Sequence, residues 1–173
     1  MGWFRTRRVR RTGPDRYAVR LAPEERALLA ALAGDLRSVL EETTDEPHLR
    51  RLFPTAYNED PERDREYQQL ARDELLSRRL AALDATIATA EAEELDAAGL
   101  GAWMGAINDL RLVIGTALDV SEDDGPFDRA DPRAGDRAVY AHLTGLLDDV
   151  VDALADGLPD APAPPPPGPA DPI

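Results

Sequence analysis

Three polar residues inside the longest apolar segment are the first candidates for chemistry. The segment spans residues 99–120, and its mainly apolar side chains surround Asn108, Asp109 and Arg111. Apolar residues recur at helical spacing on more than one side of this segment, which predicts a buried central helix over about 97–118. An unpaired charge on such a helix is very costly. The three residues therefore indicate either a structural polar cluster that orients helices or a site for a partner.

Arg111 has to find a carboxylate or reach solvent, because it falls in the apolar arc of this helix beside Met104 and Ile107. We expect it to pair with an acidic residue from the segment 43–60 or from the helix that follows. The acidic candidates in that segment include Asp45, Glu46 and Glu59.

Residue types that carry most enzyme chemistry are scarce in this chain. There is no cysteine, which excludes disulfides, thiol catalysis and thiolate metal sites. No metal-binding motif surrounds His48 or His142, and no serine lies in a G-x-S-x-G motif. No pair of carboxylates is set apart as an acid and a base. We therefore expect a protein that is not an enzyme, with no catalytic residue, metal or cofactor.

Three glycines near the start of the central helix could suggest a nucleotide-binding loop. Gly99, Gly101 and Gly105 have the spacing G-x-G-x-x-x-G, whereas a dinucleotide-binding loop needs G-x-G-x-x-G directly after a strand. The spacing does not fit, and we expect no strand before it. The glycines indicate instead close packing against a neighbouring helix.

A basic segment at the N-terminus is the second candidate site. The net charge is −14, but residues 1–21 hold seven arginines and one aspartate, a local charge of +6 that leaves −20 for the rest. This candidate basic ribbon consists of Arg5, Arg7, Arg8, Arg10 and Arg11. It is either a solvated face or a surface for phosphates or an acidic partner, since a two-stranded ribbon can enter a major groove. The acidic remainder argues against an extended nucleic-acid footprint.

Sequence patterns place these candidates on a mainly α fold. Alternating polar and apolar residues with turn residues between them predict a β-hairpin over 3–21. Apolar residues at helical spacing predict helices over about 23–42, 61–91, 97–118 and 137–156, the third capped by Asp96. With the segment 43–60 docked on them, we expect a compact bundle of five to six helices around the central helix, with the short N-terminal hairpin at one edge.

The helix expected over 61–91 carries two apolar stripes that face in different directions. Tyr67 and Leu70 belong to one stripe, and Leu80 and Leu83 to the other. One straight helix cannot serve a single core with both stripes, so we expect a break near Arg72–Asp73. A continuous helix between two partners is the alternative.

The domain organisation follows from composition. Residues 1–158 are expected to form a single helical domain, and residues 159–173, eight of which are proline, a disordered proline-rich tail. No run of about 18 apolar residues exists, so no membrane span is expected. The N-terminus also lacks the apolar region of a secretory signal. A cytoplasmic location is therefore expected.

Several phrases of the sequence resemble a known family. They are LFPTAY (52–57), EYQQLARDEL (66–75), AWMGAINDLRLVIGTALDV (102–120) and YAHLTGLLDDVVDAL (140–154). Together they resemble the actinobacterial family known as domain of unknown function 2017, over roughly residues 3–157. The resemblance implies a small cytosolic protein. It also implies a link to regulation of the oxidative-stress transcription response, acting with the transcription machinery. Sensing by paired cysteines cannot be carried over, because this chain has none.

We therefore expect a non-enzymatic regulatory protein that works through a protein partner, such as the transcription machinery or a regulator. A DNA-binding module that uses the basic ribbon is the alternative, and an enzyme with an unrecognised helical site is the third possibility. The sequence leaves open whether the chain forms homo-oligomers.

Overall fold

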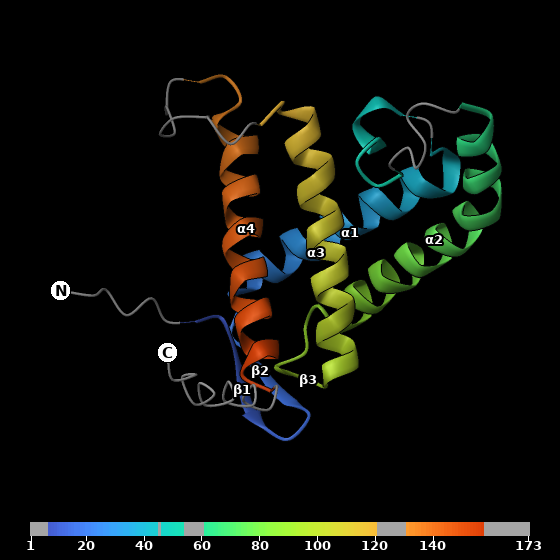
Figure 1. Ribbon diagram of the computed structural model, residues 1–173. Coiled ribbons are helices and arrows are strands. Elements are labelled where there is room, and N and C mark those ends of the chain that lie inside the picture. Colours follow the sequence, from blue (N-terminus) through green and yellow to red (C-terminus); the bar gives the residue numbers. More distant parts are fainter. Residues whose placement is uncertain (1–6, 45, 54–60, 121–130, 158–173) are drawn as a thin grey trace, which may run out of the picture.

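The computed structural model describes residues 7–44, 46–53, 61–120 and 131–157, with only the backbone described for 61–71. Four α-helices in this part of the chain pack beside a small sheet (Figure 1). The helices are α1 (Pro23–Glu42), α2 (Pro61–Thr89), α3 (Ala97–Ala117) and α4 (Ala134–Ala155), with a short 3-10 helix η1 (Pro47–Leu49). The strands are β1 (Val9–Gly13), β2 (Arg16–Val19) and β3 (Glu94–Leu95).

The predicted central helix is confirmed as α3. It contacts the other three helices, η1 and the sheet. Its core face includes Leu100, Trp103 and Ile107, none of which is exposed to solvent. The predicted cap is also present, since the Asp96 carboxylate accepts a hydrogen bond of 2.7 Å from the Gly99 amide. The expected burial of Met104 is wrong, because this side chain is 38% exposed.

The predicted N-terminal hairpin is confirmed, but it belongs to a sheet with a third strand. The strand order is β1-β2-β3, with both pairs antiparallel. The turn places Asp15 at φ 53°, a conformation that aspartate tolerates better than most residues. The Asp15 carboxylate accepts a hydrogen bond of 2.7 Å from the Ala97 amide at the start of α3. The hairpin is thus tied to the central helix as well as to β3.

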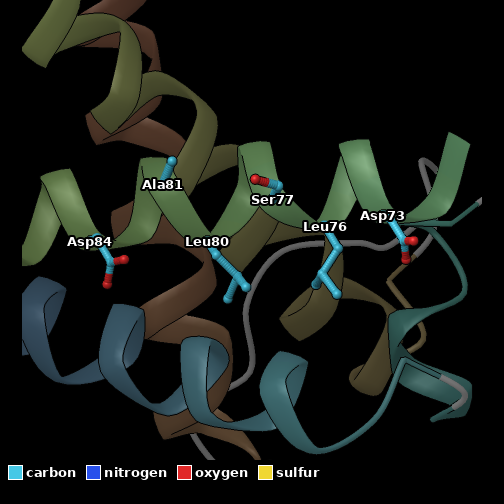
Figure 2. Close-up of a pocket in the computed structure, with 6 residues that line it drawn as sticks. All are labelled: Asp73, Leu76, Ser77, Leu80, Ala81 and Asp84. Carbon is cyan, nitrogen blue, oxygen red and sulfur yellow. The ribbon is translucent and has the colours of Figure 1, made fainter.

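Helix α2 runs without a break from Pro61 to Thr89, so the break expected near Arg72–Asp73 is wrong. The alternative, a continuous helix between two partners, is confirmed by its contacts with both α1 and α3. Leu76 and Leu80 point towards α1 in Figure 2, where they line a shallow depression of about 390 Å³. Leu83 is completely buried.

The expected count of five to six helices is also wrong for the described residues, which contain four α-helices and η1. One reason is that α2 is one element where two were expected. The described part of the segment 43–60 supplies η1, and its Leu49 and Leu52 are completely buried. Residues 121–130 lie outside the described part, as does the tail from residue 158 onward. No helix within the described residues has the length and apolar character needed to cross a membrane.

Candidate functional site

The buried charge on α3 is Asp109, and its partner is Arg79 of α2. Asp109 is 5% exposed, and Arg79 donates a hydrogen bond to its carboxylate. A second Arg79 nitrogen donates to the Leu52 carbonyl at 2.8 Å, and the guanidinium lies 5.7 Å from the centre of the Phe53 ring. Burial raises the pKa of Asp109, and Arg79 opposes that rise. This cluster joins α3, α2 and the segment after η1, which is a structural role.

Arg111 lies elsewhere, on the face of α3 that meets α4. Its Nε donates a hydrogen bond of 3.0 Å to the Thr144 hydroxyl, and its guanidinium lies 5.6 Å from the centre of the Tyr140 ring. Of the carboxylates expected to pair with Arg111, Asp45 and Glu59 lie outside the described residues, and Glu46 is exposed. The structure thus separates Arg111 from Asp109, which serve different interfaces.

Helices α3 and α4 lie side by side in opposite directions (Figure 1). The ring of Tyr140 lies against Gly115, where a Cβ atom would come within 2.9 Å of the ring. The next turn of α3 brings Arg111 to Thr144. Further along both helices, Met104 of α3 and Val151 of α4 line one groove. We call this line of paired positions the α3–α4 seam, and Asn108 lies half-buried on α3 between its upper and lower parts.

The lower end of the seam opens into an apolar groove of about 460 Å³, here called the seam groove. Tyr17 of β2 contributes to its wall, and the other lining residues are Ala97, Met104, Val151, Leu154, Ala155 and Gly157. A contiguous exposed apolar surface is one mark of an interaction site. Met104 is 38% and Val151 46% exposed, and Ile87 on α2 is the remaining large exposed hydrophobic residue in the described chain.

Small residues contribute to keeping this region open. No atom of a neighbouring element in the described structure lies within 4 Å of the position that a Cβ would take at Gly101. Gly101 lies between Ala97 and Met104 at helical spacing on α3. The expected close packing of three glycines is therefore wrong for Gly101, and Gly99 contacts the cap residues before α3. Only Gly105 of the three faces another helix, at an ordinary 3.8 Å from Ala82.

The arginines of the candidate basic ribbon bind the acidic face of α4. Arg7 forms ion pairs with Asp152 and Asp156 at 3.0 and 3.1 Å. Arg8 pairs with Asp149 at 2.8 Å, and the Asp149 side chain is only 4% exposed. These contacts hold the hairpin on α4 and reduce the positive charge available to an outside ligand.

The remaining ribbon residues complete this description. Arg11 donates a hydrogen bond of 3.1 Å to the Asp156 carbonyl, and Arg10 is exposed on β1. Arg5 lies outside the described residues. The ribbon therefore has a structural component that its sequence pattern did not predict.

His142 lies beside the Arg8–Asp149 pair. Its Nδ1 is 3.4 Å from the Arg8 guanidinium and 3.6 Å from the Glu25 carboxylate. Burial and the positive charge of Arg8 lower the pKa of His142, while Glu25 opposes this change. A neutral imidazole fits this position. Among the described residues, no group of three or more possible ligands could bind a metal ion.

Sequence reasoning missed three residues that matter here. Val151 was assigned to no candidate site, because one exposed apolar residue on a helix carries no signal by itself. Asp149 follows Asp148 in the sequence, yet only Asp149 is buried. Arg26 resembles other arginines in the sequence but is 7% exposed and donates to four backbone carbonyls.

The fold and the seam define a small, mainly helical protein that offers an apolar groove beside a three-stranded sheet. The chain belongs to the family described as "Domain of unknown function (DUF2017)", whose family model matches residues 4–154. No curated protein and no solved structure matches the chain.

Proposed function

We propose that this protein is a non-enzymatic binding protein that docks a protein partner in the seam groove. The observation that carries the proposal is the exposure of Met104 and Val151 on facing helices, inside one apolar groove. Apolar and flexible side chains such as methionine are common at binding surfaces. An apolar anchor of a partner that fills such a groove removes both side chains from water and supplies the main binding energy.

Charges around the groove favour a partner with basic residues beside its apolar anchor. Asp148 is exposed on the same face of α4 as Val151, one turn before it. The chain as a whole carries a net charge of −14. Opposite charges at the rim of an interface mainly increase the association rate and the specificity.

The cellular setting that we propose is control of transcription in the cytoplasm under oxidative stress, with the transcription machinery or one of its regulators as the partner. Support comes from the family resemblance of the phrases around the seam, such as AWMGAINDLRLVIGTALDV. A chain without cysteine has no thiol with which to sense an oxidant. In this setting the protein binds a regulator and does not detect the oxidant through a thiol.

Direct DNA binding by the basic ribbon and an unrecognised helical enzyme stay as alternative predictions. The ion pairs of Arg7 and Arg8 with α4 make the first less favourable, because a phosphate would have to displace carboxylates already in contact. The apolar walls of the seam groove supply few polar groups for catalysis.

A capture experiment with matched variants tests the proposal. The full chain, Val151→Asp and Ile87→Asp are immobilised in turn, exposed to a lysate of the source cells, and the bound proteins are identified by mass spectrometry. Ile87 is the control, because it is also exposed but lies on α2 away from the groove. We expect one specific partner, whose Kd rises roughly 30-fold with Val151→Asp, the loss of about 2 kcal/mol typical of a central apolar anchor.

Capture that is equally strong with wild type and Val151→Asp would overturn the groove as the docking site. An equal loss of capture with Val151→Asp and Ile87→Asp would also overturn the groove as the docking site, since Ile87→Asp must leave the Kd unchanged. Circular dichroism of each variant checks that the helices remain folded.

A further inference from the structure

We infer that His142 is a pH-sensitive switch, which holds the N-terminal hairpin on α4 while its imidazole is neutral and loosens the hairpin when the imidazole takes up a proton. His142 lies on α4, beside Arg8, the residue directly before β1. The switch needs no partner in the seam groove and therefore goes beyond the proposed function.

The switch consists of three polar atoms from three parts of the fold. His142 Nδ1 lies 3.4 Å from Arg8 Nη1 and 3.6 Å from Glu25 Oε1. The same two atoms of Arg8 and Glu25 are 3.7 Å apart. Glu25 belongs to α1, and its other carboxylate oxygen accepts a hydrogen bond of 2.8 Å from the Ala22 amide. The helix start thus holds this carboxylate beside the imidazole.

The proton on Nδ1 decides which neighbour the imidazole can bind. A guanidinium has only donors, so Arg8 can bond to Nδ1 only while that nitrogen carries a lone pair and the ring proton is on Nε2. An imidazolium has a proton on both nitrogens and accepts no hydrogen bond. It can instead donate from Nδ1 to the Glu25 carboxylate, and it repels the Arg8 guanidinium. Protonation therefore exchanges Arg8 for Glu25 as the partner of His142.

Arg8 connects this exchange to the hairpin. Its Nε binds the buried Asp149 carboxylate of α4 at 2.8 Å, and its carbonyl accepts a hydrogen bond of 2.7 Å from the Arg20 amide just after β2. The side chains of Arg8 and His142 are only 20% and 24% exposed, so solvent and salt screen their repulsion poorly. A protonated His142 therefore weakens the hold of Arg8 on α4 and loosens the hairpin.

The charges around His142 set the direction of the switch. Arg8 and Glu25 act on the imidazole directly, whereas Asp149 acts through its ion pair with Arg8. Burial and Arg8 lower the pKa of His142, and Glu25 opposes them. The closed hairpin thus takes up a proton less readily than the open or unfolded chain. Its stability is complete above the ordinary pKa of histidine and falls as the pH drops through that value.

The hairpin also supplies Tyr17 to the wall of the seam groove. A loosened hairpin changes this wall, so acidic pH should weaken binding of a partner there. This last step alone rests on the proposed function. The experiments below use the full chain without a partner, so a failure of partner capture does not affect them.

Nitrogen NMR of the histidine rings in the full chain tests the exchange of partners. At about pH 8, where histidine is neutral, we expect the His142 proton on Nε2. Glu25→Gln should move the titration of His142 to lower pH, because it removes the carboxylate that favours the imidazolium, while its amide oxygen can still accept from Ala22. Arg8→Gln should move the titration to higher pH. A proton on Nδ1 in the neutral wild type would overturn the switch, as would a titration that neither variant moves.

Hydrogen exchange of the full chain tests the connection to the hairpin. The readout is the protection factor of the Arg20 amide, which bonds to the Arg8 carbonyl, divided by that of the Ile107 amide in the α3 core. We expect this ratio to fall about threefold or more between about pH 7.5 and about pH 5.5 in the wild type. It should fall equally in the control His48→Gln and stay constant in His142→Gln.

An equal fall of the ratio in His142→Gln would overturn the switch, because another group would then control the hairpin. A constant ratio in the wild type would overturn it as well, since protonation of His142 would then leave the hairpin closed. Circular dichroism at both pH values checks that each variant is folded.

Discussion

At the scale of single residues, the pair of Arg79 and Asp109 stabilises the fold by a different mechanism from that of the exposed ion pairs. Replacing Arg79 with leucine leaves the Asp109 carboxylate buried without its cation, and it removes the donor of the Leu52 carbonyl. We expect a loss of about 3–5 kcal/mol in the free energy of unfolding, typical of a buried pair broken on one side. Urea denaturation measures this loss.

The matched control is the neighbouring Arg78→Leu. The Arg78 side chain is 72% exposed and pairs with Glu74 on the same helix, so its loss should change stability by less than about 0.5 kcal/mol. Burial already raises the pKa of Asp109, and removal of Arg79 raises it further. A raised pKa means that the folded state takes up a proton more readily than the unfolded state. The loss of unfolding free energy caused by Arg79→Leu, relative to the wild type, should therefore shrink as the pH falls from about 7 to about 5. A stability loss that does not depend on pH would contradict the presence of a charged, unpaired Asp109 in Arg79→Leu.

Which residues carry charge on α3 was predictable, whereas their partners were not. The sequence identified Asn108, Asp109 and Arg111 as a polar set within an apolar helix. Helical spacing alone could not assign Asp109 to α2 and Arg111 to α4, because the directions of neighbouring helices are decided by packing over the whole domain. Within the described residues, Arg111 contacts a hydroxyl and an aromatic ring of α4, which the sequence did not predict.

At the scale of elements, alanine substitutions at Gly101 and Gly115 of α3 distinguish the effect of helix propensity from that of packing between helices. Gly101→Ala places its Cβ in open space and should stabilise the protein by about 0.5–1 kcal/mol, the usual difference between alanine and glycine within a helix. Gly115→Ala places its Cβ 2.9 Å from a ring carbon of Tyr140. The ring must shift, and we expect a net loss of about 1–2 kcal/mol, within the range for overpacking.

Thermal and urea denaturation of both variants measures this contrast. The propensity gain is the same at both positions, so any difference between them reports the contact with Tyr140. Equal stabilisation by both substitutions would show that α4 can move away from α3 without cost. The antiparallel register of the α3–α4 seam would then have little energetic support.

Element boundaries were predictable where local signals are strong. Pro23 and the two glutamates after it are typical of a helix start, and Glu25 accepts a hydrogen bond of 2.8 Å from the Ala22 amide at the start of α1. By contrast, the expectation that no strand precedes the glycines of α3 is wrong, because β3 lies directly before this helix. β3 has only two residues, too few for an alternating pattern. The two stripes of α2 were recognised, but the helix continues without a break and contacts both α1 and α3.

At the scale of the whole molecule, the sequence was sufficient for a mainly helical fold with an N-terminal hairpin around one central helix. What holds these parts together depends on buried arginines whose partners are carbonyl groups. Carbonyl acceptors exist at every residue, so no sequence pattern marks such a contact. The seam groove was equally unpredictable, because it requires the relative placement of α3, α4 and β2.

Arg26 joins the sheet to both neighbouring helices, and its replacement should therefore affect the whole molecule. Its guanidinium donates to carbonyls at four positions, with distances from 2.7 to 3.2 Å: Val19, Leu21, Ala90 and Ala92. The Ala90 carbonyl directly follows the end of α2, where the helix dipole favours a positive charge. Arg26→Leu leaves these acceptors without the donor, and we expect a loss of about 3 kcal/mol or more in the free energy of unfolding.

Local hydrogen exchange distinguishes the effect of Arg26→Leu from a general loss of stability. The Val19 amide donates to the Glu93 carbonyl at 2.8 Å, beside the Arg26 contacts, so its hydrogen exchange should accelerate more than that of the α3 core. Arg26→Lys should lose an intermediate amount of unfolding free energy, because an ammonium group lacks the forked donor geometry of the guanidinium and cannot reach all four carbonyls. Arg20→Leu is the control, since Arg20 is exposed at the end of β2. If Arg26→Leu lowered the free energy of unfolding no more than Arg20→Leu, the sheet would be held by its apolar residues alone. The hydrogen bonds of Arg26 would then contribute nothing to stability.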